Sequence, residues 1–190
     1  MRHATTETSA RAPLAPVSSG YADVNGIKLY HEIYGQGGPL VLLHGGLMTI
    51  GEMSTPLERL AKTHKVIAVE LQGHGRTADT DRLLSFETMG DDIAALLAHL
   101  DMSQADIVGF SLGAAVGLRT AIQHPEKVRR LVVISSPYAK GGWYPEAQEG
   151  MGRVSAAMAE NLMQTPTGKF STQWPEPRTV SSRASRNARA

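Results

Sequence analysis

A serine between two glycines is the residue of this 190-residue chain best suited to chemistry. The pentapeptide 109–113 follows an apolar run typical of a buried strand and opens a small-residue pattern typical of a helix. Joining the two without a loop holds Ser111 in a sparsely allowed backbone conformation, and Gly109 and Gly113 lack side chains that would collide there. The spacing predicts a serine nucleophile beside a Leu112 amide that faces a developing oxyanion. A turn without chemistry is the alternative.

A glycine loop upstream is a second candidate site. The apolar run 39–43 predicts a buried strand, which ends in His44, Gly45, Gly46 and Leu47. A glycine loop at the carboxyl end of a strand can bring a backbone N–H close to a ligand. We expect Gly46 or Leu47 to donate the second hydrogen bond of an oxyanion hole, with His44 and Gly45 supporting the loop. An ordinary turn is again the alternative.

A third apolar run, 65–71, leads into a glycine-rich loop at 72–77. Three such loops in this order and spacing resemble the α/β-hydrolase superfamily, and the resemblance extends over roughly residues 21–164. It implies a three-layer fold and places the chain near the serine esterases, lactonases and carbon–carbon bond hydrolases. Relatives that open epoxides or remove halide have an aspartate at the nucleophile position, and Ser111 argues against those reactions. Glu70, where the family more often has aspartate, is expected to be structural.

The resemblance also implies an activity. Ser111 would attack a small-molecule carboxylic ester or lactone, and water would release the acyl group from the resulting acyl-enzyme. No cofactor is needed for this chemistry. A dinucleotide is not expected, because the first glycine loop lacks the spacing of a dinucleotide-binding fingerprint. A metal is not expected either, because no His and carboxylate pair has ligand spacing.

The other two members of a catalytic triad are not found in the sequence. The family order is serine, then acid, then histidine, but the only histidine after Ser111 is His124 and no acid lies between the two. We call the strand–helix junction at 109–113 the elbow. His124 is separated from it by about twelve helical residues, and hence lies about 18 Å from Ser111. His44 and His74 lie at the same sheet edge as Ser111, although a turn-stabilising role fits them better. We therefore hypothesise that Ser111 is unactivated, and the alternative function is a truncated, non-catalytic hydrolase-fold protein.

The strands and helices expected on either side of these loops indicate an α/β fold. A hairpin is expected where two strand-like segments, 21–24 and 27–33, flank the turn signal Asn25-Gly26. Strands are then expected at 39–43, 65–71, 105–110 and 129–135, alternating with helices near 55–63 and after Ser85. This alternation indicates a mainly parallel sheet covered on both faces, with an N-terminal antiparallel hairpin.

The chain divides into four expected regions. Residues 1–20 form a disordered extension, 21–140 a partial hydrolase core, 141–170 the start of cap or lid helices, and 171–190 a disordered tail. The resemblance implies eight strands, and six are found. We therefore expect the last two strands to be missing, the chain to be C-terminally truncated, and the apolar strand 130–134 to form an unprotected edge.

Composition excludes several partners. A formal charge of +1 gives no reason to expect a nucleic acid, and no apolar run approaches the length of a membrane helix. The absence of cysteine excludes disulfides and is compatible with a cytoplasmic protein. The sequence leaves the oligomeric state and the substrate open.

Overall fold

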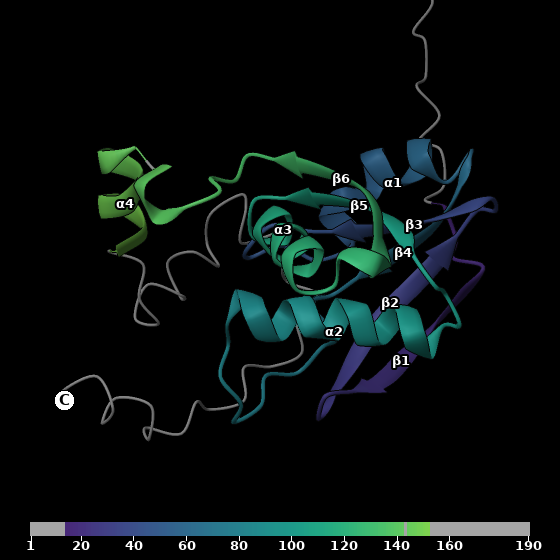
Figure 1. Ribbon diagram of the computed structural model, residues 1–190. Helices are drawn as coiled ribbons and strands as arrows, with labels where there is room; N and C mark the ends of the chain where they lie inside the picture. Colours follow the sequence, from purple (N-terminus) through teal and green to yellow (C-terminus); the bar gives the residue numbers. More distant parts are fainter. Residues whose placement is uncertain (1–13, 143, 153–190) are drawn as a thin grey trace, which may run out of the picture.

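The computed structural model describes residues 14–142 and 144–152 of the chain (Figure 1). Its six-stranded mixed sheet has the order β1-β2-β4-β3-β5-β6. The strands are β1 Ser18–Val24, β2 Ile27–Tyr34, β3 Gly38–Leu43, β4 His64–Val69, β5 Ala105–Phe110 and β6 Val128–Ile134. The α-helices are α1 Ser54–Leu60, α2 Phe86–His99, α3 Leu112–Gln123 and α4 Pro145–Gly152. Three short 3-10 turns cover Gly51–Met53, Pro125–Lys127 and Lys140–Gly142.

The predicted mixed sheet is confirmed. β1 and β2 form an antiparallel hairpin, whose turn residues Asn25 and Gly26 have φ of 46° and 83°. Two positive φ values at a two-residue turn match the twist of the flanking strands, as the Asn-Gly pair predicts. β2 is antiparallel to β4, whereas β4, β3, β5 and β6 run parallel. All six strands expected from the sequence are present.

One boundary differs from the prediction. β1 begins at Ser18, so 18–20 belongs to the sheet and not to the extension expected over residues 1–20. These residues pair through their backbone with the stretch 31–33 of β2, and such hydrogen bonds need no apolar side chain. Because these three residues are Ser, Ser and Gly, the pattern of apolar side chains does not indicate that the strand begins at Ser18.

Helices cover both faces of the sheet. Figure 1 shows α2 and α3 together on one face and α1 on the other. Ser85 caps α2 through a reciprocal pair of hydrogen bonds with Thr88, which fixes the start of the helix as the sequence predicts. Side chains at helical spacing on α2 are buried against the sheet: Met89, Ile93, Leu96 and Leu97. A second apolar cluster lies between α1 and the opposite face of the sheet.

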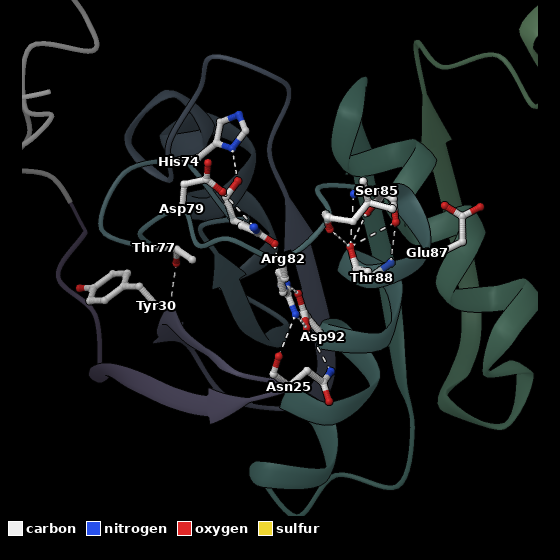
Figure 2. A network of polar contacts seen from close by, with 12 residues as sticks. Asn25, Tyr30, His74, Thr77, Asp79, Arg82, Ser85, Glu87, Thr88 and Asp92 are labelled. Atoms are coloured by element: carbon white, nitrogen blue, oxygen red, sulfur yellow. Dashed lines mark hydrogen bonds and ion pairs between the residues drawn. The ribbon is translucent and has the colours of Figure 1, made fainter. Parts of the chain in front are cut away.

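Buried polar contacts hold the long connection between β4 and α2 (Figure 2). Arg82 donates to both carboxylate oxygens of the buried Asp92 and to the side-chain oxygen of Gln72. Thr77 accepts a hydrogen bond of 2.9 Å from the backbone N–H of Tyr30. Through the hydrogen bonds of Thr77 to Tyr30 and of Arg82 to the backbone of Asn25, this loop is fixed against the hairpin.

The regions predicted for the C-terminal part of the sequence fall largely outside the described residues. Of the cap or lid helices expected to start within 141–170, α4 Pro145–Gly152 lies among the described residues. The rest of that region and the tail expected over 171–190 lie outside the described part of the chain, as do residues 1–13.

Candidate active site

Ser111 is the single residue between β5 and α3. Its φ of 51° and ψ of −111° lie outside the regions that residues with side chains ordinarily adopt. Its N–H donates to the carbonyl of Ile134 at 2.8 Å, and its own carbonyl accepts from Ala114 and Ala115 at 3.1 Å each. Backbone hydrogen bonds on both sides therefore hold the strained conformation, as expected for a strand joined directly to a helix.

The two glycines of the elbow stand where no side chain fits. A Cβ atom built on Gly109 would lie 2.3 Å from the carbonyl oxygen of Gly113, and one on Gly113 would lie 2.6 Å from the carbonyl oxygen of His44. Both neighbours are backbone atoms, which cannot move aside as the end of a flexible side chain would. The close approach of β3, β5 and α3 at this point thus depends on both glycines.

The loop after β3 lies directly against the elbow. The Gly113 N–H donates to the carbonyl of His44 at 3.0 Å, and a Cβ built on Gly46 would lie 3.9 Å from Cβ of Leu112. Leu47 has a φ of 61° and is more than half exposed. Within the described residues, the Leu112 amide has no hydrogen-bond acceptor. The backbone of Gly46, which precedes Leu47, thus lies close to Leu112 at one sheet edge.

His44 supports this loop through both ring nitrogens. Its Nε2 accepts from the Leu71 N–H at 3.1 Å, and its Nδ1 lies 2.7 Å from the carbonyl oxygen of Gly45. The acceptor role of Nε2 places the proton on Nδ1, which donates to that carbonyl. Burial lowers the pKa of His44 to about 4. His44 therefore joins β3, the glycine loop and the end of β4, and neither nitrogen is available to take a proton from Ser111.

Acid should destabilise the fold through His44. Its pKa is about 4 in the folded chain against 6.5 ordinarily, so the unfolded chain binds more protons between these values. Stability is therefore lost as the pH falls below about 6.5, by about 2 kcal/mol at about pH 5. We expect His44→Gln to remove this part of the pH dependence, since glutamine takes up no proton and its oxygen can still accept from Leu71. Urea unfolding across pH measures it, and an equally steep loss in the variant would contradict the assignment.

The other histidines considered as a base lie elsewhere. The His74 ring is 5.0 Å from that of His44, and its Nδ1 lies 2.9 Å from the carbonyl oxygen of Gln72. His124 is the C-cap residue of α3, at the end of the helix away from Ser111, as the sequence predicts. Its Nε2 lies 2.7 Å from the carboxylate of Asp91. Across residues 14–142 and 144–152, no imidazole forms a hydrogen bond with the Ser111 hydroxyl.

A buried charge cluster beside the glycine loops was missed by sequence reasoning. Glu70 is 1% exposed and accepts hydrogen bonds from the backbone and side chain of Arg76. The same guanidinium donates to Glu32 at 2.8 Å and lies 3.9 Å above the ring of Tyr30. A Cβ built on Gly75 would lie 2.3 Å from the Glu70 carboxylate, so this glycine makes room for the acid. The one sign of this cluster in the sequence was Glu70, which stands where the family more often has an aspartate.

A cavity of about 590 Å³ opens beside this cluster. Glu32, Tyr34, Glu70 and Arg76 line its polar side, and Ile50 and Leu57 its apolar side. The described residues contain no group of three or more metal-ligating side chains. Nor is any helix in the described part of the chain long and apolar enough to cross a membrane.

Comparisons with known proteins show which family model and which proteins this chain is similar to. A family model described as alpha/beta hydrolase fold matches residues 38–173. The dihydrolipoyllysine-residue acetyltransferase component of the acetoin cleaving system from Pseudomonas putida is 37% identical over 117 residues, which cover 60% of this chain and 32% of that protein. The 2-hydroxymuconate semialdehyde hydrolase of Pseudomonas sp. (strain CF600) is 35% identical over 115 residues, which cover 58% of this chain and 41% of that protein.

A solved structure extends the similarity. Est816, described as an N-acyl homoserine lactone degrading enzyme, superimposes with a TM-score of 0.64 and 26% identity over 82% of this chain and 64% of its own. The chain spans less than half of the length of the two curated relatives.

Proposed function

This chain belongs to the α/β-hydrolase fold family, and from that premise we propose that it is a serine hydrolase acting on a carboxylic ester or lactone through Ser111. Hydrolases among its relatives support a hydrolytic function for the family as a whole. The observation that best supports ester or lactone hydrolysis through Ser111 is the strained backbone of this residue. It lies between β5 and α3, beside the glycine loop after β3.

In the proposed reaction, Oγ of Ser111 attacks the carbonyl carbon and loses its proton to a base. The amides of Leu112 and of Gly46 or Leu47 hold the oxyanion of the tetrahedral intermediate. The leaving alcohol departs with a proton, and water then hydrolyses the acyl-serine and restores the hydroxyl. This sequence of steps needs a small-molecule substrate and no metal or organic cofactor, and the proposal includes neither a nucleic acid nor a membrane partner.

A second candidate function is a hydrolase-fold protein that does not turn over substrate. The observation that favours it is the absence, within the described residues, of an imidazole bound to the Ser111 hydroxyl. A serine hydroxyl is a weak nucleophile until a base removes its proton, and the base needs an orienting acid. The two candidates therefore differ in whether Ser111 is acylated at a useful rate.

A nitrophenyl ester distinguishes them. For the serine hydrolase we expect a first-turnover burst of nitrophenolate equal to one equivalent of chain, followed by slower release. Ser111→Ala should abolish the burst while leaving the fold intact, because the side chain of Ser111 makes no hydrogen bond within the described residues. Stopped-flow absorbance measures the burst, and labelling by a fluorophosphonate provides an independent readout. No burst and no labelling in the original chain would instead establish the non-catalytic function.

A further inference from the structure

Asn25 and Gly26 are the one Asn-Gly pair of the chain, and they form the exposed turn between β1 and β2. Both residues have positive φ, and a Cβ atom built on Gly26 would meet nothing within 4 Å. Among the described residues, the Gly26 N–H has no hydrogen-bond acceptor. The backbone nitrogen that follows Asn25 is therefore accessible, because no side chain shields it and no partner holds its hydrogen.

The side chain of Asn25 is held to the rest of the molecule at one point. Its Nδ2 donates to Oδ1 of Asp92 at 3.0 Å, and within the described residues this is its one hydrogen bond. Asp92 is 1% exposed and also binds the guanidinium of Arg82, which donates at 3.1 Å to the backbone carbonyl of Asn25. Figure 2 shows these three residues together. The uncharged amide of Asn25 thus completes the environment of a buried carboxylate.

We propose that Asn25 is a site of spontaneous deamidation, and that its products loosen the β1–β2 hairpin from Arg82 and Asp92. The Gly26 nitrogen attacks the side-chain carbonyl carbon of Asn25, and a new C–N bond closes a five-membered imide. The bond from that carbon to the side-chain nitrogen breaks, and this nitrogen leaves as ammonia with the hydrogen that Gly26 loses. Water then opens the imide at either carbonyl and gives aspartate or isoaspartate. The reaction is independent of the chemistry at Ser111.

The aspartate product would place a second carboxylate beside Asp92. Two carboxylate oxygens would then meet where Nδ2 of Asn25 and Oδ1 of Asp92 are now 3.0 Å apart. The guanidinium of Arg82 already binds both oxygens of Asp92, and its Nε donates to Gln72. Like charges this close are destabilising, and the buried Asp92 has no water to turn to. The contact between the hairpin and the connection from β4 to α2 is therefore weakened.

The isoaspartate product would act on the turn itself. In isoaspartate the main chain runs through the side-chain carbon, which adds one methylene to a loop of two residues. Val24 and Ile27, on either side of the turn, are paired across β1 and β2. The φ values of 46° and 83° fit a loop of two normal residues between paired strands, and a longer backbone does not keep this fit. Both products therefore act at the same end of the hairpin.

Peptide mapping by mass spectrometry tests the site, after the folded chain is kept at physiological temperature in mildly alkaline buffer. We expect a mass increase of about one dalton in the peptide that contains Asn25, and faster than in the peptides of Asn161 and Asn187. Those asparagines precede Leu162 and Ala188, whose side chains hinder attack by the backbone nitrogen. Labelling by an isoaspartyl methyltransferase identifies the isoaspartate.

Asn25→Gly is the matched control, because a Gly-Gly pair accepts the same turn and has no side-chain amide. This variant should lose both the mass increase and the label at the turn. Conversion at Asn25 that is no faster than at Asn161 and Asn187 would overturn the proposal, as would a label that persists at the turn of the variant.

Urea unfolding tests the effect of the new charge. Asn25→Asp carries the charge of the product, and we expect its equilibrium constant for unfolding to rise about tenfold, since a hydrogen bond to a buried carboxylate is lost and a like charge is added. Combining it with Asp92→Asn lets an amide again donate to a carboxylate, in the opposite direction, and should restore part of the stability. Equal stability of Asn25→Asp and the original chain would refute the loosening. If Asn25→Asp does not fold, the same measurement on fresh and aged original chain decides it.

Discussion

Replacing Gly109 by alanine is expected to lower the free energy of unfolding by about 3 kcal/mol or more. The new methyl group would lie 2.3 Å from the Gly113 carbonyl oxygen and 2.6 Å from Cα of Ala114, both backbone atoms of α3. Relief requires the start of α3 to move away from β5, which would also break the contact between Gly113 and His44. The same substitution should therefore disturb the loop after β3 as well as the elbow.

Urea unfolding of Gly109→Ala beside Gly20→Ala provides the measurement and its control. Both glycines lie in strands, but a Cβ atom built on Gly20 meets nothing within 4 Å. We expect the control to stay within about 0.5 kcal/mol of the original chain, as surface substitutions usually do. Equal stability of the two variants would mean that the elbow is more adaptable than its geometry indicates.

The local features of the fold could be predicted from sequence because their causes are local. Asn25-Gly26 predicts a tight hairpin through the φ values that those residues tolerate, and Ser85 predicts the start of α2 through its capping hydrogen bond. β5 also has the expected bounds, since an apolar run and a glycine elbow define both of its ends.

Boundaries set by distant contacts could not be read from the sequence. The strand expected over 65–71 ends at Val69, although Leu71 is as apolar as its predecessors. The Leu71 N–H instead binds the ring of His44, and Glu70 binds Arg76. The partners of these groups come from other parts of the chain, and hydrophobic periodicity does not specify them.

One part of the candidate site could also be predicted from the sequence, and another part could not. Ser111, its flanking glycines and the glycine loop after β3 are contiguous motifs, and their placement at one sheet edge follows from the parallel strands that carry them. The cluster of Glu32, Glu70 and Arg76 joins β2 to the connection between β4 and α2, and Glu32 and Arg76 are 44 positions apart in the sequence. Such a cluster becomes visible only when the sheet order is known.

That cluster leads to the second large prediction, for Arg76→Met. Glu70 is 1% exposed, and in the variant its carboxylate loses the guanidinium that binds it at 2.8 Å. Glu32 loses the same partner. Breaking a buried pair leaves an uncompensated charge, and we expect the free energy of unfolding to fall by about 3 kcal/mol. Lys28→Met removes a cation from an exposed pair with Asp23 at a similar distance of 2.9 Å and should cost about 0.5 kcal/mol.

The contrast between these variants separates burial from charge. If the loss in Arg76→Met comes from the stranded Glu70 carboxylate, adding Glu70→Gln should restore part of the stability, because the neutral amide costs less to bury. A double variant less stable than Arg76→Met would show that packing of the arginine over the Tyr30 ring dominates instead. Equal losses for Arg76→Met and Lys28→Met would contradict the buried-charge account altogether. Urea unfolding of the four chains at neutral pH decides between these outcomes.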